Sequence, residues 1–313
     1  MQLAQIVLLA LLGIAGLTFA LLWFASLVRR GEWKWPTPYQ AFVGFVTDFL
    51  DTLGIGSFAL TTALYRPFKV VDDHLIPGTL NVGHALPTVA QALLIIAIIK
   101  VDIATLWLLI AASVVGAWFG AGIVSKLPRR AVQAGMGYAL LTAAAFLLAG
   151  IFERLPPGGS ALELTGPKLA IAVTANAVFG ALMTIGVGAY APIMVMVSLL
   201  GMNQSAAFPI MMGSCAFLMP AASSQFIKNR RYDVRAALGL TVLGVPAVCL
   251  AAPLIGALPK RGLEWLVVCV VVYTALTMLW SAHSAAAGDP AAAESGQHDS
   301  ATDDTPPSES GLS

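Results

Sequence analysis

Long apolar stretches alternate with short polar segments along almost the whole chain. A helix needs about 20 apolar residues to cross the roughly 30 Å of hydrocarbon in a bilayer. The uninterrupted stretches near this length are residues 3–28, 75–99, 103–124, 131–150, 205–227, 236–256 and 263–281. The pattern predicts an all-α integral membrane protein whose helices cross the bilayer many times.

Two further apolar stretches, residues 40–65 and 169–200, are interrupted by pairs of glycines. In the first, residues 40–53 predict a helix of about 21 Å and residues 57–65 one of about 13 Å, each reaching roughly to mid-membrane. If each stretch turns back at its glycines, it is a re-entrant hairpin. If each crosses fully, the chain has nine spans.

The glycine breaks are the first candidate for a site. Gly54 and Gly56 can take backbone angles that other residues avoid, and Ser57 is expected to cap the second half-helix. Unwound backbone at that depth must line a cavity in protein, because bare amides in lipid are costly. The N-terminus of a half-helix carries partial positive charge and free N–H donors, which favours an anion site. The alternative is that these glycines only allow close helix packing.

An internal repeat follows from sliding the chain against itself. A shift of 132 residues aligns Gly54-Ile55-Gly56 with Gly186-Val187-Gly188, and Pro77 with Pro209. We therefore expect two inverted repeats, each a broken re-entrant hairpin plus three transmembrane helices, after one extra N-terminal helix. The expected parts are an N-terminal helix at 1–30, a first repeat at 37–150, a loop at 151–167, a second repeat at 168–283 and a disordered acidic tail at 284–313.

The distribution of basic residues tests the two topologies. With nine full spans, basic residues divide 10 to 7 between the two sides; with re-entrant hairpins, they divide 12 to 5. The second division fits the positive-inside rule better, and it predicts a multi-pass protein of the cell (inner or plasma) membrane with its amino terminus outside and its acidic tail in the cytoplasm. The twelve residues of the basic side are Arg29, Arg30, Lys34, Arg66, Lys69, Lys126, Arg129, Arg130, Lys228, Arg230, Arg231 and Arg235.

Composition agrees with a membrane protein. Hydrophobic residues make up 58% of the chain and charged residues 11%, a balance that a soluble domain of this size could not keep in solution. Cys215, Cys249 and Cys269 lie in apolar segments without paired spacing, so neither a disulfide framework nor a metal site is expected. The tail carries six of the sixteen acidic residues, which leaves 17 basic against 10 acidic residues in the rest.

Polar residues follow each hairpin in the next helix. Asn81 and His84 share a helix face, and a buried imidazole beside an amide can donate to an anion or hold a proton, although a His in a helix is as often a packing residue. The residues expected to bind substrate are Gly54, Ile55, Gly56, Ser57, Thr79, Asn81, His84, Gly186, Val187, Gly188, Gly213, Ser214 and Cys215.

Asp48 and Asp51 lie three apart on the first half-helix. A carboxylate at membrane depth is a functional hypothesis by default. Near an anion it must be protonated or paired with a cation, so we expect coupling to a proton or sodium through one of them. The alternative is that they lie at the interface or pair with Arg66 or Lys69.

These patterns predict a secondary carrier for a small anion, with a passive anion channel as the first alternative. No nucleotide-binding loop, metal-ligand cluster or serine elbow with a matching base occurs in the sequence. We therefore expect neither an enzyme nor a cofactor, and no nucleic-acid partner. An intramembrane enzyme or assembly factor using His84 and the acidic pair is the further alternative, and the oligomeric state stays open, a homodimer included.

Four segments resemble the TauE/SafE family of sulfite exporters and toluene-sulfonate uptake permeases. They read GFVTDFLDTLGIGSFA followed by IPGTLNVGHALP, and GALMTIGVGAYAP followed by FPIMMGSCAFLMPAAS. The resemblance covers about residues 39–282 and implies two similar halves that carry a sulfur-containing anion such as sulfite or an organosulfonate. Many members have three or four successive glycines where Ser57 and Ala189 stand here, which implies a pocket of different size.

Overall fold

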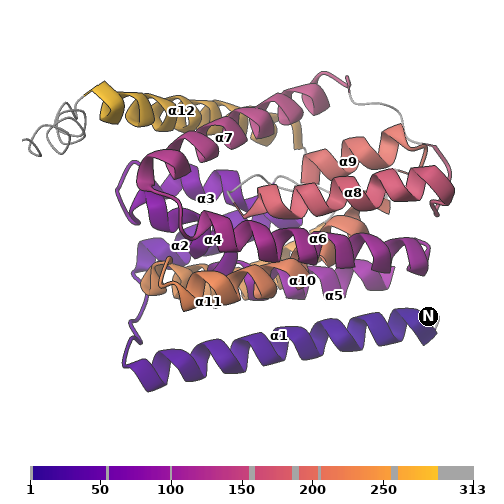
Figure 1. The fold of residues 1–313 in the computed structure, drawn as a ribbon, viewed down its shortest axis with the longest axis horizontal. Coiled ribbons are helices and arrows are strands. Elements are labelled where there is room, and N and C mark those ends of the chain that lie inside the picture. The colour runs from indigo at the N-terminus through magenta and orange to yellow at the C-terminus, as the bar shows by residue number, and fades with distance from the viewer. Residues whose placement is uncertain are drawn as a thin grey trace, which may run out of the picture.

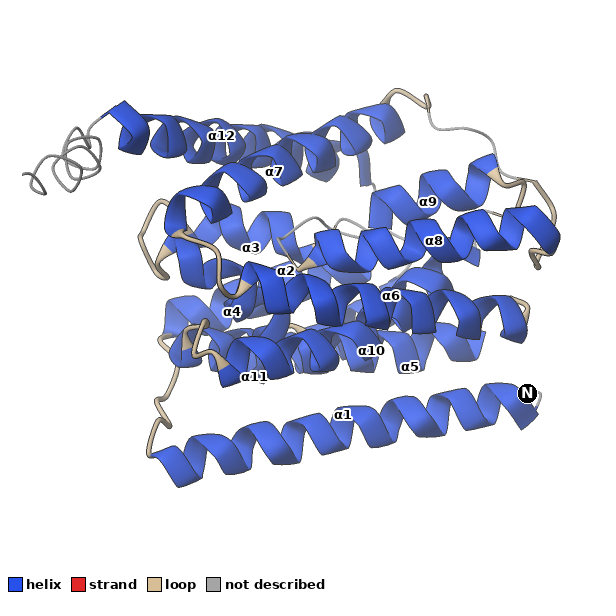
Figure 2. Cartoon of the chain, viewed as in Figure 1, coloured by secondary structure: helices blue, strands red, loops and turns tan. Residues whose placement is uncertain are grey.

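The protein is helical throughout its described part, in a computed structural model that describes residues 3–53, 56–98, 101–154, 159–184, 190–203, 206–254 and 260–287 (Figures 1 and 2). No strand occurs among these residues; Ala161 and Met202 form an isolated bridge. The helices are α1 (Leu3–Arg30), α2 (Pro38–Thr52), α3 (Ser57–Tyr65), η1 (Asp73–Leu75), α4 (Ile76–Gly83), α5 (Ala85–Ile98), α6 (Ile103–Val124), α7 (Arg129–Ile151), α8 (Gly166–Met183), α9 (Tyr190–Leu199), α10 (Ala207–Lys228), α11 (Val234–Ala251), η3 (Ala252–Leu254) and α12 (Lys260–Ala287).

Local capping sets several helix starts. Thr37 accepts from the Gln40 amide while the Gln40 side chain accepts from the Thr37 amide, a capping box directly before Pro38. Asp102 and Asp233 cap α6 and α11 by accepting from the amide three residues later. Such caps fix where each helix leaves its polar turn.

Seven helices among the described residues are long and apolar enough to cross a membrane, judged by length and composition. The fold is therefore all-α, as predicted, and compatible with a multi-pass membrane protein. Large apolar side chains such as Leu17, Leu21 and Phe119 point outward from it, which suits a surface whose solvent is lipid.

Both glycine-interrupted stretches form hairpins that return to the end they came from. The Tyr39 hydroxyl at the start of α2 donates to the Leu64 carbonyl near the end of α3 at 2.8 Å. In the second stretch, the Lys168 ammonium at the start of α8 donates to the Leu200 carbonyl just after α9 at 3.0 Å. The start and end of each stretch are therefore neighbours, as the re-entrant alternative requires.

The hairpins pack against helices from the other part of the chain. The most extensive contacts join α2 to α11 and α8 to α6. Glycines bring the backbones together in both seams: a Cβ at Gly44 would lie 2.6 Å from the Leu240 Cα, and one at Gly180 would meet the Ser113 carbonyl. The helix α7 packs along α12, and α5 packs along α10 (Figure 1).

One end of the molecule gathers the polar turns. Arg235 Nε donates to the Trp35 carbonyl at 2.8 Å, and Asn229 Nδ2 donates to Ser125 Oγ at 2.8 Å. These bonds tie the α10–α11 turn to both the α1–α2 linker and the α6–α7 turn. Three turns that carry ten of the twelve basic residues therefore lie at one end.

A break separates α4 from α5 at His84, which the sequence reading did not predict. Pro87 has no N–H, so the Gly83 carbonyl four residues earlier has no helical donor. The Thr241 hydroxyl of α11 donates to that carbonyl at 2.7 Å instead. A neighbouring helix thus satisfies the backbone group that the proline leaves open, as a membrane interior requires.

The helix α1 runs along the edge of the bundle. Gln5 Nε2 donates to the Ile96 carbonyl at 2.6 Å near one end, and Trp23 Nε1 donates to the Tyr232 hydroxyl at 3.3 Å near the other. Between them Gly16 packs against Val89 of α5. The extra N-terminal helix is therefore fixed to the bundle at three levels.

Candidate functional site at the first hairpin

Three side chains from separate helices form a buried hydrogen-bonded chain. His84 Nδ1 lies 2.8 Å from Asp48 Oδ1, and His84 Nε2 lies 3.0 Å from Thr61 Oγ1. All three residues are fully buried. Asp48 comes from α2, Thr61 from α3, and His84 from the break between α4 and α5. The hairpin and the helix that follows it thus meet at this imidazole.

The fold holds the chain from two sides. The Phe58 ring lies 5.8 Å from the imidazole, centroid to centroid, and the rings are inclined by 32°. On the other side the α11 backbone at Gly244 lies against Asp48, because a Cβ built there would clash with Asp48 Oδ2 and with Pro87. A residue larger than glycine at 244 would therefore displace the carboxylate.

This chain can hold a proton without losing its geometry. In the neutral imidazole, Nδ1–H donates to Asp48 and Nε2 accepts from the Thr61 hydroxyl. In the imidazolium, Nδ1–H still donates to Asp48, while Nε2–H donates to the Thr61 oxygen. Both hydrogen bonds exist in both states, so a proton can be taken up or released here by rotating a single hydroxyl.

Asp51 caps the second half-helix. Its Oδ1 accepts from the Ser57 backbone N–H at 2.8 Å, across the break. Gly56 precedes α3 with φ +92°, and no side chain at that position caps the helix. The prediction that Ser57 is the cap is wrong: Ser57 is the first residue of α3. The carboxylate therefore occupies the place at the helix N-terminus where an anion is favoured.

Two residues near this site were not predicted. Thr61 completes the chain on His84, and Gln91 Nε2 donates to Thr52 Oγ1 at 2.9 Å, linking α5 to the end of α2. A signal for Gln91 was present, because it follows His84 by seven residues and so lies on the same helix face. Thr61 gives no such signal, because a threonine in an apolar helix is common.

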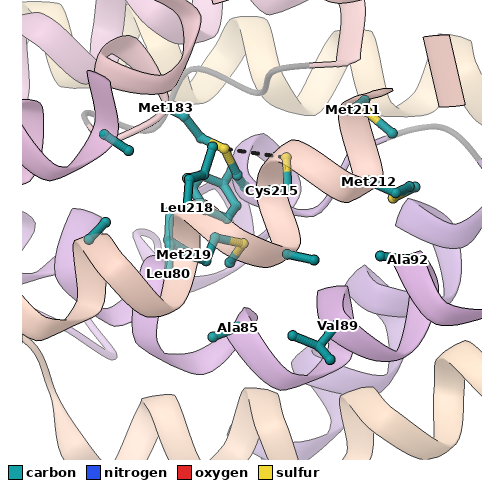
Figure 3. Packing of buried hydrophobic residues seen from close by; sticks show 14 of the residues in the cluster. Leu80, Ala85, Val89, Ala92, Met183, Met211, Met212, Cys215, Leu218 and Met219 are labelled. Atoms are coloured by element: carbon teal, nitrogen blue, oxygen red, sulfur yellow. Dashed lines mark hydrogen bonds between the residues drawn. The ribbon is translucent and has the colours of Figure 1, made fainter. Parts of the chain in front are cut away.

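The second half contributes amide and sulfur groups. Asn176 Nδ2 of α8 donates to the Leu109 carbonyl at 2.6 Å and to Ser214 Oγ at 3.1 Å. Cys215 Sγ lies 3.5 Å from Met183 Sδ, and Figure 3 shows the two side chains meeting. Asn176 was not predicted, although an amide in an apolar stretch was a signal in the sequence; the structure buries it fully. Ser214 and Cys215 thus lie beside the C-terminal half of α8.

Other residues predicted to bind substrate form structural contacts instead, or lie outside the described residues. The Thr79 hydroxyl accepts from the Asp233 amide at 2.9 Å, so it holds the α10–α11 turn. Asn81 donates to the Pro77 carbonyl at 2.8 Å. Gly213 packs tightly on Ile110 of α6. Gly54, Ile55, Gly186, Val187 and Gly188 lie outside the described residues.

The carboxylate of Asp48 neither lies at the surface nor pairs with Arg66 or Lys69, which were the two alternatives to ion coupling. Asp48 pairs with His84, whereas Arg66 pairs with Asp73. Among the described residues, four buried carboxylate or amide oxygens of α2, α4, α5 and α8 have no hydrogen-bond donor: Asp48 Oδ2, Asn81 Oδ1, Gln91 Oε1 and Asn176 Oδ1. Unpartnered acceptors in an apolar interior favour a proton, a water molecule or a small cation. In the described part of the chain, no three His, Cys, Asp or Glu residues form a group that could hold a metal ion.

Comparisons with family models, with curated proteins and with solved structures gave no match. The fold and the site by themselves define a class of protein. It is an all-α protein with helices long and apolar enough to span a membrane, and with a buried carboxylate–imidazole–hydroxyl chain beside a broken hairpin.

Proposed function

We propose that this protein is a secondary carrier for a small sulfur-containing anion, such as sulfite or an organosulfonate. The observation that carries the proposal is the Asp51 carboxylate on the Ser57 amide, because it marks the half-helix N-terminus as a place where negative charge is bound inside an apolar bundle. The class of anion comes from the resemblance to the TauE/SafE family.

The proposal includes two inverted repeats around this centre. With a shift of about 132 residues, α2 corresponds to α8 and α6 to α11. The α2–α11 and α8–α6 seams are then the same contact made twice, each between a hairpin of one half and a helix of the other. The helix pairs α7–α12 and α5–α10 join corresponding elements across the centre. Reciprocal pairing of this kind supports a carrier that rocks one half against the other.

Asp51 suggests how transport is coupled. While ionised, it occupies the Ser57 N–H and repels a second anion. When protonated, it becomes a weak acceptor, so an incoming anion can take the amide in its place. One proton and one anion then bind together, and neither is held well alone. We therefore assign the proton as the coupling ion, and transport as symport.

The Asp48–His84–Thr61 chain serves as the proton store. The imidazole can gain a proton and keep both of its hydrogen bonds, and the resulting cation stays paired with Asp48. A sodium ion fits the chain less well, because the imidazole binds Asp48 Oδ1 and leaves Oδ2 as the only open oxygen of that carboxylate, whereas sodium needs several oxygen ligands. Asp48 lies on the same half-helix as Asp51, one turn earlier, so a proton has a short route between the two carboxylates.

The test is flux into proteoliposomes containing the full-length protein. Uptake of sulfite, thiosulfate and a small sulfonate is measured with no gradient, with an imposed pH gradient and with an imposed sodium gradient. We expect accumulation of at least one of these anions above equilibrium with the pH gradient alone. Equilibration without accumulation under every gradient would identify a passive channel. Uptake of a cation or sugar, with none of these anions, would overturn the proposal.

One observation favours a second candidate, an intramembrane hydrolase. A hydroxyl, an imidazole and a carboxylate in series, at 3.0 Å and 2.8 Å, are the parts of a nucleophile and its oriented base. A fluorophosphonate probe tests this candidate directly. Covalent labelling of Thr61, lost in Thr61→Val and kept in Thr61→Ser, would establish an enzyme; an unlabelled protein that transports the anion would exclude it.

A further inference from the structure

A groove separates α1 from α10 at the end of the molecule where both helices terminate. It encloses about 570 Å³, and its apolar wall includes Phe19, Leu22, Pro220 and Ile227. Leu22 is 63% exposed, so the groove opens sideways, toward the surroundings of the bundle. An apolar groove open on the lipid side of two membrane helices is accessible to acyl chains without any passage through water.

The groove has the depth of one leaflet. Its lining begins at Ala15, in the middle of α1, and ends at Arg30, the last residue of that helix. Fifteen residues at a rise of about 1.5 Å per residue span about 22 Å. Half of a bilayer with its headgroup layer measures about 20–22 Å. The groove thus runs from mid-membrane to the headgroup level.

Two cations close the groove at its headgroup end. Arg30 ends α1, Lys228 ends α10, and both side chains line the groove. Within the described residues neither forms a salt bridge, whereas nearby Arg230 pairs with Glu32. Ser224, also on the lining, adds an exposed hydroxyl one turn inside Lys228. The Ser224 hydroxyl already donates to the Ala221 carbonyl at 2.6 Å. The mouth therefore offers two positive charges above an apolar floor.

Rings from both helices form the floor. Trp23, which also lines the groove, is fixed by the bond from Nε1 to the Tyr232 hydroxyl and stacks on Phe19 at 5.7 Å between ring centroids. Pro220 lies inside α10 and lacks an N–H, so it removes a backbone bond at the same level. The groove is thus bounded by fixed aromatic and proline rings.

We propose that this groove binds one anionic diacyl phospholipid, with an acyl chain along Phe19 and Pro220 and its phosphate between Arg30 and Lys228. Charge complementarity selects an anionic headgroup, since a zwitterionic one brings its own cation to the same mouth. The apolar length selects a lipid over free phosphate, which would leave the wall uncovered. The site is independent of the central hairpin and of the transported species.

Native mass spectrometry of the full-length protein in detergent tests this inference. Phosphatidylglycerol and phosphatidylcholine with identical acyl chains are added at equal concentration, and retained lipid is counted. We expect one phosphatidylglycerol to be retained at least tenfold better than phosphatidylcholine. In Arg30→Gln/Lys228→Gln the preference should disappear. In Arg29→Gln/Lys126→Gln, which removes two charges from the same end but outside the groove, it should persist.

A third variant tests the apolar part of the groove apart from the two cations at its mouth. Ala15→Trp should fill the deep end of the groove and reduce retention of both lipids, with the charges unchanged. Equal retention of the two lipids by the unmodified protein would overturn the proposal. So would equal loss of preference in the control pair, which would indicate general surface charge, or full displacement by millimolar glycerol 3-phosphate, which would indicate a headgroup-only site.

Discussion

The backbone N–H of Ser57 donates to Asp51 Oδ1 at 2.8 Å, so the N-terminus of the second half-helix is capped by a carboxylate of the first half-helix. An anion that reaches this N-terminus competes with a negative charge already built into the chain. In the proposed carrier, substrate binding and the protonation of Asp51 are linked equilibria, because the same amide would serve both acceptors.

Removing that charge should uncouple anion binding from pH. In Asp51→Asn the side-chain oxygen can still accept from Ser57, but it carries no charge and needs no proton to yield the amide. We expect anion uptake by the unmodified protein to fall as the pH rises, because Asp51 then loses the proton that frees the amide, and uptake by Asp51→Asn to stay level. Asp51→Ala also removes the cap and should cost about 1 kcal/mol of stability. An Asp51→Asn protein with unchanged pH dependence would refute this role.

Replacing the imidazole should separate movement of the anion from movement of the proton. His84→Gln keeps a hydrogen-bonding side chain but cannot be charged, so we expect exchange of labelled for unlabelled anion to continue while accumulation driven by a pH gradient is lost. Asp48→Asn should behave in the same way, since the imidazolium loses its counter-ion. If His84→Gln accumulates the anion normally, the proton store lies elsewhere.

The hydroxyl of Thr61 should matter for stability as well as for coupling. Thr61→Val leaves His84 Nε2 buried without a partner, which costs about 1–3 kcal/mol. Thr61→Ser keeps the oxygen and serves as the matched control. Thermal unfolding in detergent should show a clearly lower midpoint for the valine variant alone. Equal midpoints would mean that Nε2 has found another donor, such as water.

The glycine seams should not tolerate a methyl group. A Cβ at Gly44 or at Gly180 would press on the backbone of the partner helix, so the helices would have to separate. We expect Gly44→Ala and Gly180→Ala to destabilise the protein by about 1–3 kcal/mol each. Gly122→Ala in α6, where a Cβ meets nothing within 4 Å, should be neutral or slightly stabilising. Similar losses in all three variants would point to a general effect of glycine replacement.

The side of the membrane reached by each turn can be measured by cysteine labelling. In a Cys249→Ala/Cys269→Ala background, single cysteines at Lys126 and Lys228 should react with an impermeant maleimide from the same side, and a cysteine at Lys168 from the opposite side. The positive-inside rule assigns the first two to the cytoplasm. Labelling of positions 126 and 228 from opposite sides would contradict the inverted topology.

Two substitutions test the glycine breaks themselves. Gly54→Leu and Gly186→Leu should each abolish transport while expression and membrane insertion persist, because a large side chain would fill the anion pocket. Both glycines lie outside the described residues, so the prediction rests on the sequence pattern and on the hairpins around them. A matching loss of protein level would favour a packing role.

Helix positions were predictable where local chemistry decides them. The helix α6 spans Ile103–Val124, the range expected from hydropathy, because Asp102 caps its start. The bounds of α3 also agree with the expectation. In both cases the helix starts directly after a residue with a strong local preference, Asp102 as a cap and Gly56 with its positive φ, so neighbours along the chain carry enough information.

The partners of His84 could not be predicted from local sequence, because the hydrogen bonds of the Asp48–His84–Thr61 chain join residues that are far apart along the sequence. His84 was expected to act with Asn81 on one helix face, yet its partners are Asp48, 36 residues earlier, and Thr61, 23 residues earlier. The break that turns His84 toward them depends on Pro87 and on a hydroxyl of α11, 158 residues beyond Gly83. Periodicity shows that a residue faces inward, and only packing decides which residue it meets.

The contact between Gly244 and Asp48 links hydration to helix movement. Among the described residues the buried Oδ2 of Asp48 has no donor, and the bare α11 backbone at Gly244 lies directly on it. Separation of α2 and α11 along the seam that Gly44 keeps tight would uncover that oxygen. Opening the seam would wet the carboxylate and lower the cost of its charge, and closing it would dry the carboxylate again. The hydration of Asp48 therefore depends on how closely α2 and α11 pack.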